Sequence, residues 1–345
     1  MFTIEYYKPK EIPQLQQSWQ TLERGEDMTY FQTFDWYAML AKVGLVQEEW
    51  IETIVAVIIK DNTPVLIAPL IIVKRTYHFV NKKGVYFWGR KGWSDYLNMI
   101  YNQFNSDAVD YLILSIKEKY GLKRFFFEQV RAKTAFYQYL KNDVPSVVAN
   151  DTTCVALNLP ESVDDYLKML SKHSRQNLRT AQNRLDKDGI KLRISFDDAE
   201  VDKMLCKKMR ERRVEEKQRV YYNHLSLLWK ILYRVKCFLE YKYPSYLPFC
   251  SDEHSKMLTV YDGDTLCSFF NYGIDRYHKT IVLMAVGTNE QYARYSPGIQ
   301  ALYSFIRSKI EEKDIECFDF TRGDEPYKFA LGGSNSLIYN VEYNT

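Results

Sequence analysis

The chain has 345 residues, a length that predicts two domains at about 150 residues per domain. Apolar residues make up 46% and charged residues 26%, as in globular proteins, which excludes a disordered or collagen-like chain. The net charge of +3 is too small for a dedicated nucleic-acid-binding protein, so no DNA partner is expected.

Metal and membrane signals are missing from the sequence. The six cysteines and five histidines have neither CxxC nor zinc-site spacing, so we expect reduced thiols and no metal. No apolar stretch follows a basic N-terminus, and the longest apolar run, 64–73, is about half the ~20 residues of a membrane-spanning helix. We therefore expect a cytoplasmic protein without a membrane span.

The first half of the chain predicts helices and then a small sheet. A helix is expected to begin after Asn105, a favoured N-cap residue, and to end at Gly121. The other elements expected from periodicity are helices at 12–22 and 34–43 and strands at 51–60, 65–73, 85–88 and 124–130.

The second half predicts the same order of elements with longer helices before it. Ser296-Pro297-Gly298 opens a helix, because Ser is a good N-cap and Pro is favoured at the first helical position. The remaining elements are strands at 154–159, 256–261, 265–274, 280–286 and 315–320 and helices at 163–185, 199–217 and 225–241.

Both halves therefore contain three strands, a helix and a closing strand, which indicates a duplicated domain. We expect an N-terminal domain at 1–150 and a C-terminal domain at 151–345. The expected fold class is α/β (α+β), with a mixed, mostly antiparallel sheet flanked by helices in each domain.

Four segments resemble the BioF2-like, CelD-type GNAT acyltransferases. They are 31–36 (FQTFDW), 94–97 (SDYL), 171–179 (SKHSRQNLR), and 295–298 (YSPG) followed by 318–328 (FDFTRGDEPYK). The resemblance implies two tandem GNAT domains, an architecture related to that of the FemABX aminoacyl transferases. It also implies an N- or O-acyltransferase that moves an acyl group from acyl-CoA or acetyl-CoA to an amine or hydroxyl, on a sugar used in surface polysaccharide synthesis.

The resemblance implies that the helix after Ser296 holds the pyrophosphate of coenzyme A, with contacts from Ser296, Gly298 and Ile299. A helix N-terminus suits a phosphate, because it carries unpaired N–H groups and a partial positive charge. The family's Q/R-x-x-G-x-G/A loop is incomplete here, since Pro297 lacks an N–H, and an ordinary capped helix would explain the residues equally well. Arg175 and Arg179 share a helix face and are candidates for holding donor or acceptor phosphates.

Acyl transfer needs a base, oxyanion donors and an acid for the leaving group. The resemblance implies Tyr327 as the candidate acid, because many GNAT enzymes place a Tyr after this strand, and Lys328 is the candidate stabiliser of negative charge. Asp95 is the candidate base, because desolvation by neighbouring aromatic residues strengthens a carboxylate as a base. The candidate substrate-binding residues are Trp93, Tyr96, Asp319, Arg322 and Asp324. We expect Asp95 to meet Tyr327 and Lys328 in a cleft between the domains.

Structural roles and other functions compete with this hypothesis. Asp319 and Arg322 would also serve as a pair that holds the loop, Asp95 as a cap of a turn, and the basic run at 203–219 as a solvated face. The alternative functions are FemABX-like transfer from aminoacyl-tRNA and a non-catalytic carbohydrate- or partner-binding module. A small-molecule or sugar-linked acceptor is favoured over tRNA, because phosphate contacts need a more concentrated positive surface.

Overall fold

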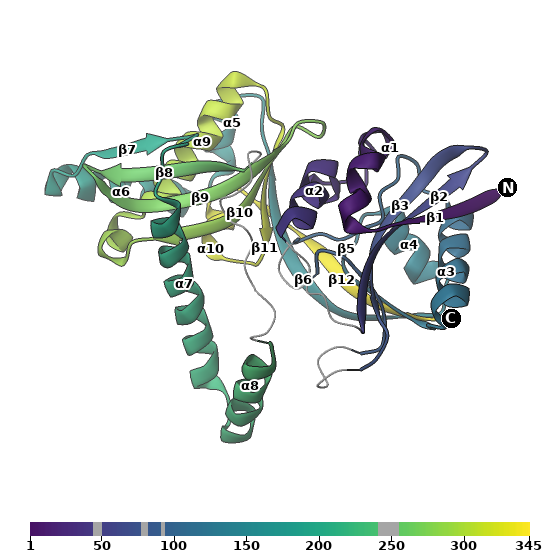
Figure 1. Ribbon diagram of the computed structural model, residues 1–345. Coiled ribbons are helices and arrows are strands. Elements are labelled where there is room, and N and C mark those ends of the chain that lie inside the picture. The colour runs from purple at the N-terminus through teal and green to yellow at the C-terminus, as the bar shows by residue number, and fades with distance from the viewer. Residues whose placement is uncertain (44–49, 77–81, 91–93, 241–254) are drawn as a thin grey trace. The chain divides into compact units, whose positions relative to one another are not determined.

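The computed structural model describes residues 1–43, 50–76, 82–90, 94–240 and 255–345 (Figure 1). The chain divides into two compact units. The first contains Met1–Thr153, residues 235–240 and Ser336–Thr345, and the second contains Cys154–Arg234 and residues 255–335, so the helix Leu227–Glu240 is divided between the units. Among the described residues, no helix is both long enough and apolar enough to cross a bilayer.

The first unit is a six-stranded sheet with the strand order β1-β2-β3-β4-β5-β12. All described pairings in it are antiparallel except that of β4 with β5, which is parallel. Its elements are β1 (Phe2–Tyr7), η1 (Pro9–Leu15), α1 (Gln16–Leu22), η2 (Tyr30–Gln32), α2 (Phe34–Val43), β2 (Ile51–Lys60), β3 (Thr63–Val73), β4 (Gly84–Phe87), α3 (Ser106–Tyr120), β5 (Arg124–Arg131), α4 (Ala135–Asn142) and the C-terminal strand β12 (Ser334–Asn344).

The second unit has the strand order β6-β11-β10-β9-β8-β7, and its parallel pair is β10 with β11. Its elements are β6 (Ser146–Asn158), α5 (Val163–Met169), α6 (Lys172–Asp188), β7 (Leu192–Ser195), α7 (Lys203–His224), α8 (Leu227–Glu240), β8 (Lys256–Asp262), β9 (Thr265–Asp275), β10 (Thr280–Thr288), η3 (Glu290–Tyr295), α9 (Pro297–Glu312), β11 (Cys317–Arg322) and α10 (Pro326–Ala330).

The predicted repeat is confirmed, as is the predicted fold class of a mixed, mostly antiparallel sheet flanked by helices. β2-β3-β4-α3-β5 in the first unit corresponds to β8-β9-β10-α9-β11 in the second. A backbone detail supports the same correspondence. Gln129 in β5 and Thr321 in β11 have left-handed φ values of 58° and 57°, and each lies where its strand shifts register against its antiparallel neighbour. The two units therefore share the same unusual backbone conformation at equivalent positions of their closing strands.

The C-terminal strand crosses from the second half of the sequence into the first unit. β12 pairs with β5 from Ile338↔Arg131 to Asn344↔Arg124. β6 begins in the first unit and ends in the second, where it pairs with β11. The predicted division at residue 150 did not include the return of β12 to the first unit or the sharing of β6 between the two units.

The core of the second unit depends on the alternation of side chains along its strands. Leu258 and Phe270 pack with α9 on one face of the sheet, whereas their neighbours Met257 and Phe269 pack with Cys206 and other residues of α7 on the opposite face. α9 places Ala301, Leu302, Phe305, Ile306 and Ile310 against the sheet, as its apolar spacing predicts. The helices thus cover both faces of the sheet.

Two predicted helices are wrong in detail. The helix expected at 163–185 is two helices, because the hydroxyl of Ser171 accepts a hydrogen bond from the Ser174 N–H (3.0 Å) and starts α6 anew. The helix expected at 12–22 begins as the 3₁₀ segment η1, which contains Pro9 and Pro13.

Two of the segments that carry the resemblance lie together in the first unit. The Gln32 side chain donates to the Tyr96 carbonyl (3.0 Å), and the Trp36 indole donates to the Ser94 hydroxyl (2.9 Å). All four residues are buried. The Leu97 N–H donates to the carbonyl of Gln129, the residue with positive φ (3.1 Å). Segments 31–36 and 94–97 therefore stabilise each other through buried hydrogen bonds.

We predict that Ser94→Ala lowers the free energy of unfolding by about 1–3 kcal/mol, because it leaves the buried Trp36 indole N–H without its acceptor. Ser308→Ala is the control, since its hydroxyl bonds to Glu312 on an exposed helix face and its loss should change stability by under about 0.5 kcal/mol. Equilibrium urea unfolding measures both, and equal stabilities of the two variants would contradict the prediction.

Candidate functional site

The parallel strands β10 and β11 are paired over only part of their length. Their ladder runs from Thr280↔Cys317 to Val282↔Asp319, whereas β10 continues beside β9 as far as Thr288. A register shift follows at Leu283, whose carbonyl accepts a hydrogen bond from the Thr321 hydroxyl (3.0 Å). We call residues 283–288 of β10 and 319–322 of β11 the β10–β11 splay. Its β10 part lies directly before η3 and α9 in the chain, and its β11 part follows α9.

The start of α9 differs from its prediction. Ser296 is the N-cap residue, but its backbone is left-handed (φ 50°) and its side chain makes no capping hydrogen bond. N-cap side chains bond to the helix from extended backbone conformations, which explains the difference. The N–H groups of Ile299 and Gln300 both donate to the Ser296 carbonyl (3.1 Å each), and Pro297 has no N–H. The helix start therefore offers few backbone donors.

Gly298 has a packing role that the sequence did not indicate. A methyl group at this position would lie 2.9 Å from the Ser268 hydroxyl and 3.2 Å from the Phe270 ring. The Ser268 hydroxyl in turn donates to the Gly287 carbonyl (2.9 Å). Gly298 thus allows α9 to lie close against β9, and a larger side chain would displace the helix from the sheet.

The first turn of α9 contains a polar group that sequence reasoning missed. The side-chain Nε2 of Gln300 is buried and has no hydrogen-bond partner among the described residues. A buried donor without an acceptor lowers the stability of the folded protein, and an acceptor that bonds to it removes this cost. A phosphate contact by Ser296 and Gly298 stays a prediction, and Ile299 is partly buried against the core. Nothing in the sequence marks Gln300, because only its surroundings leave it unpaired.

Lys328 is buried and its ammonium group binds the turn after β11. Nζ donates to the carbonyl oxygens of Thr321, Arg322 and Gly323 at 3.3, 2.9 and 3.0 Å. It also lies 3.0 Å from the Glu325 carboxylate. These contacts give Lys328 a structural role, and its expected action on an oxyanion stays a prediction.

Tyr327 lies next to this turn and packs edge-on against Phe320, with 6.5 Å between ring centroids. Burial, with a smaller contribution from the Glu325 carboxylate, raises the pKa of Tyr327 to about 12, while the Arg213 guanidinium acts in the opposite direction. The phenol therefore keeps its proton at neutral pH, as a general acid must. Arg213 belongs to the run expected to be a solvated face, but it is half-buried and acts on Tyr327.

The other candidates in the second unit have mixed surroundings. The Asp319 carboxylate accepts from the Thr321 N–H (2.7 Å), so it supports the turn, whereas Arg322 and Asp324 are exposed. Arg175 donates to the Leu167 carbonyl near the end of α5 (2.8 Å). Arg179 is exposed. Arg175 thus joins two helices, and a phosphate contact by either arginine stays a prediction.

In the first unit, Asp95 is half-buried, and Trp93 lies outside the described residues. Tyr96 is 4% exposed, with its ring against Phe31 (5.8 Å between centroids) and under the Arg131 guanidinium (5.4 Å). Such burial favours a packing role for Tyr96 over sugar stacking. The role of Asp95 as a base and its meeting with Tyr327 stay predictions.

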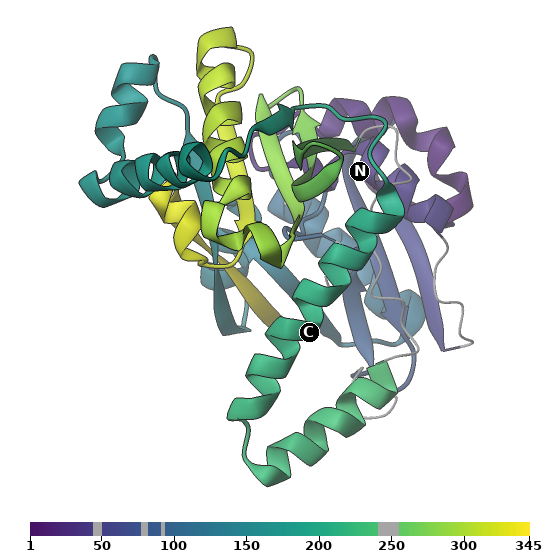
Figure 2. The ribbon, with the colours of Figure 1, turned by 90° about the vertical axis from the view of Figure 1, so that its left-hand side faces the viewer.

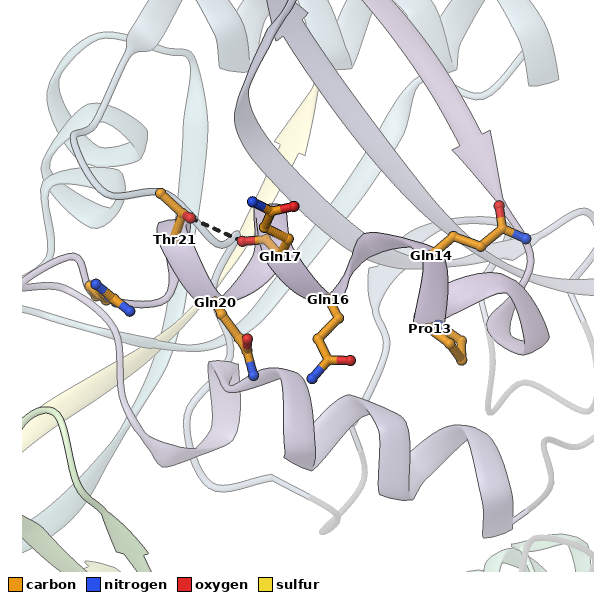
Figure 3. Close-up of a pocket in the computed structure, with 7 residues that line it drawn as sticks. Pro13, Gln14, Gln16, Gln17, Gln20 and Thr21 are labelled. Carbon is orange, nitrogen blue, oxygen red and sulfur yellow. Dashed lines mark hydrogen bonds between the residues drawn. The ribbon is translucent and has the colours of Figure 1, made fainter.

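A surface hollow of about 410 Å³ lies along η1 and α1 (Figure 3). Its lining consists of Pro13, Gln14, Gln16, Gln17, Gln20, Thr21 and Arg24, so it includes none of the predicted site residues. Gln16 and Gln20, one helical turn apart, extend in the same direction in Figure 3. Among the described residues, no group of His, Cys, Asp or Glu is placed to hold a metal ion.

We predict that Lys328→Met lowers the free energy of unfolding by about 3 kcal/mol, because it leaves the carboxylate of Glu325 and three carbonyl groups without their shared cation. Lys279→Met is the matched control, since Lys279 pairs with Glu316 on the surface and should contribute under about 1 kcal/mol. Urea unfolding distinguishes the two, and a Lys328→Met protein as stable as the control would refute the anchoring role.

Residues 245–329 match the family model of the acetyltransferase (GNAT) domain. This segment contains the β10–β11 splay, the start of α9, Tyr327 and Lys328. The narrower resemblance to the BioF2-like, CelD-type family stays a prediction. No curated protein matches the sequence.

Several solved structures share the fold over nearly the whole chain. FemX has a TM-score of 0.61 and 10% identity, over 99% of this chain and 97% of its own. A conserved protein of unknown function from Bacteroides thetaiotaomicron has a TM-score of 0.54 and 10% identity, over the full length of both chains. The C-terminal domain of a putative lysylphosphatidylglycerol synthetase from Agrobacterium fabrum has a TM-score of 0.52 and 9% identity, over 97% and 93%. Identities this low show a common fold and nothing further.

Proposed function

We propose that the chain is an acyltransferase whose second unit binds the acyl donor at the β10–β11 splay and the start of α9. The observation that carries this proposal is the parting of two parallel strands, the first of which leads through η3 to the N-terminus of α9, within the segment that matches the GNAT acetyltransferase model. Acyl-CoA or acetyl-CoA is the proposed donor. Its bound thioester supplies the acyl carbon that the acceptor attacks.

The first copy of the fold supports this assignment to the second unit. In α3, the equivalent of α9, the Asn105 side chain accepts from the Ala108 N–H (3.1 Å) and caps the helix. α9 has no such side-chain cap at Ser296. In α9 the Ile299 N–H donates to the Ser296 carbonyl instead, so the Ser296 hydroxyl is not used as a cap and is available to an anion at the positive end of the helix.

The proposed reaction assigns roles to the splay and to three residues outside it. Backbone N–H groups of β10 beyond Leu283 that face away from β9 are the proposed donors for the oxyanion. Tyr327 protonates the departing thiolate, and the nearby Arg213 charge offsets the negative charge that develops there. Asp95 is the proposed base for the acceptor. The acceptor itself, an amine or hydroxyl of a sugar for a surface polysaccharide, follows from the resemblance of the four sequence segments.

Transfer from aminoacyl-tRNA is the second candidate, and the start of α9 favours it. Pro297 has no N–H, and the N–H groups of Ile299 and Gln300 are bonded to Ser296. A pyrophosphate therefore meets few backbone donors here. An aminoacyl-tRNA carries its acyl group on a ribose ester and needs no backbone N–H groups to bind a pyrophosphate. The exposed arginines of α6 and α7 would then have to contact the tRNA.

Titration calorimetry with acetyl-CoA, coenzyme A and aminoacyl-tRNA tests these functions, and Gln300→Met tests the donor site. We predict that acetyl-CoA binds. We also predict that Gln300→Met weakens binding about tenfold or more, because a hydrogen bond to a charged phosphate is lost. The same variant should unfold at higher urea concentration, since it removes a buried unpaired donor.

Gln291→Met, an exposed change on η3, is the control and should alter neither property. A Gln300→Met protein that is stabilised but binds acetyl-CoA unchanged would place the donor elsewhere. Binding of aminoacyl-tRNA alone would establish the second candidate, and binding of no donor would leave a non-catalytic module.

We predict that Tyr327→Phe lowers kcat by about 10²–10⁴-fold, because the variant keeps the packing on Phe320 and loses only the acidic proton. The pKa of about 12 keeps the phenol protonated in the wild type, so this deficit should stay constant from about pH 6 to 10. Tyr303→Phe, a partly buried tyrosine of the same core, is the control. Steady-state rates across this pH range decide the matter, and full activity of Tyr327→Phe would exclude the acid role.

A further inference from the structure

Helices α7 and α8 form an arm whose far part, residues 220–234, has no role in the proposed reaction; Arg213, nearer the core, is the residue of α7 that the reaction uses. Figures 1 and 2 show α7 as a long helix that extends away from the sheet of the second unit. Cys206 and Met209, in its first turns, are buried in a cluster with residues of that sheet. At the far end the chain turns at Ser226, whose carbonyl accepts from the Lys230 N–H (2.9 Å). The Tyr233 ring contacts those of Tyr221 and Tyr222, at 5.6 and 6.0 Å between centroids. The arm is thus a defined element with internal contacts.

The beginning of α8 exposes a set of large apolar side chains. The exposed fractions are 78% for Leu227, 65% for Leu228, 61% for Trp229, 55% for Ile231 and 47% for Leu232. Leu227 and Ile231 are one turn apart, as are Leu228 and Leu232, so these four side chains form one continuous stripe. Contiguous exposed apolar surface of this kind marks an interaction site.

The arm is also the most basic part of the chain. Residues 203–234 contain ten Lys and Arg against three Glu, an excess of seven positive charges, whereas the whole chain has +3. The rest of the chain is therefore net negative. On α8, Lys230 and Arg234 are one turn apart and border the apolar stripe, and both approach the Tyr222 ring (5.5 and 5.3 Å). Apolar and basic side chains thus lie next to each other at the tip of the arm.

We infer that the tip of the α7–α8 arm docks on the surface of an anionic lipid bilayer. Helices that lie in a membrane interface combine Leu and Trp on one face with Lys and Arg beside it. The stripe of α8 would enter the boundary of headgroups and acyl chains, and Trp229 suits the headgroup level. Lys230 and Arg234 would reach lipid phosphates, since long basic side chains extend their charged ends toward the polar layer.

Other partners fit these residues less well. A second copy of the arm would bring two strongly basic surfaces together, which like-charge repulsion opposes. A nucleic acid would pair with the lysines and arginines but would leave Leu227, Leu228 and Ile231 in contact with phosphates or water. An anionic bilayer satisfies both the apolar stripe and its basic border.

The test is sedimentation with phosphatidylcholine vesicles that contain or lack phosphatidylglycerol. We expect the wild type to bind only the anionic vesicles, and less in 0.5 M salt than at about 0.1 M. Leu228→Gln/Leu232→Gln should lower the partition coefficient at least about tenfold. Leu114→Gln/Met169→Gln is the control, since it changes two apolar side chains that are equally exposed but lie outside the arm, and should have less than about a twofold effect.

Tryptophan fluorescence locates the contact. Among the described tryptophans, Trp19, Trp36, Trp50 and Trp88 are buried and Trp229 is exposed, and Trp93 lies outside the described residues. A blue shift on adding anionic vesicles is therefore assigned to Trp229 by its loss in Trp229→Phe. The inference is overturned if the wild type does not bind anionic vesicles or if the Leu228→Gln/Leu232→Gln protein binds them normally. Two further results would overturn it in favour of another partner. One is a dimer in sedimentation velocity that the Leu228→Gln/Leu232→Gln change abolishes, which would indicate a second copy. The other is tRNA that displaces the vesicles while the Trp229 emission stays shifted, which would indicate a nucleic acid.

Discussion

The candidate site depends on the burial of one ammonium group. Lys328 lies under the turn that ends β11 and donates to three consecutive carbonyl oxygens, from Thr321 to Gly323. Its ammonium group also pairs with the Glu325 carboxylate, which lies beside the turn. Tyr327, its neighbour in sequence, is placed by the same contacts. A charge expected to act on substrate is thus the group that shapes the surface on which substrate would bind.

Local signals account for what the sequence could predict. The strand at 51–60, the Asn105 cap and the Gly121 terminus lie where expected, because each depends on a few neighbouring residues. β12 was missed, because its residues are mostly half-buried and exposed and its pairing with β5 joins positions about two hundred residues apart. No local pattern contains that information.

The site residues show the same limit. The resemblance pointed to Ser296 and Gly298 at the start of α9 and to Lys328 after β11, and their roles toward a donor stay predictions. Their contacts differ from expectation, since Ser296 makes no side-chain cap, Gly298 serves close packing and Lys328 is buried. Gln300 and Arg213 gave no signal, because an unpaired amide and a charge near Tyr327 arise only from tertiary packing.

The path of β12 has a consequence for the order in which the chain can fold. The strand that completes the first unit beside β5 lies after every element of the second unit in sequence. During synthesis, the backbone groups of β5 that will pair with β12 must stay without that partner until the second unit has been made. An unpaired strand edge is a template for pairing with other chains, so the nascent protein passes through a stage prone to aggregation. A chain truncated at the boundary of the first half would remain at that stage permanently.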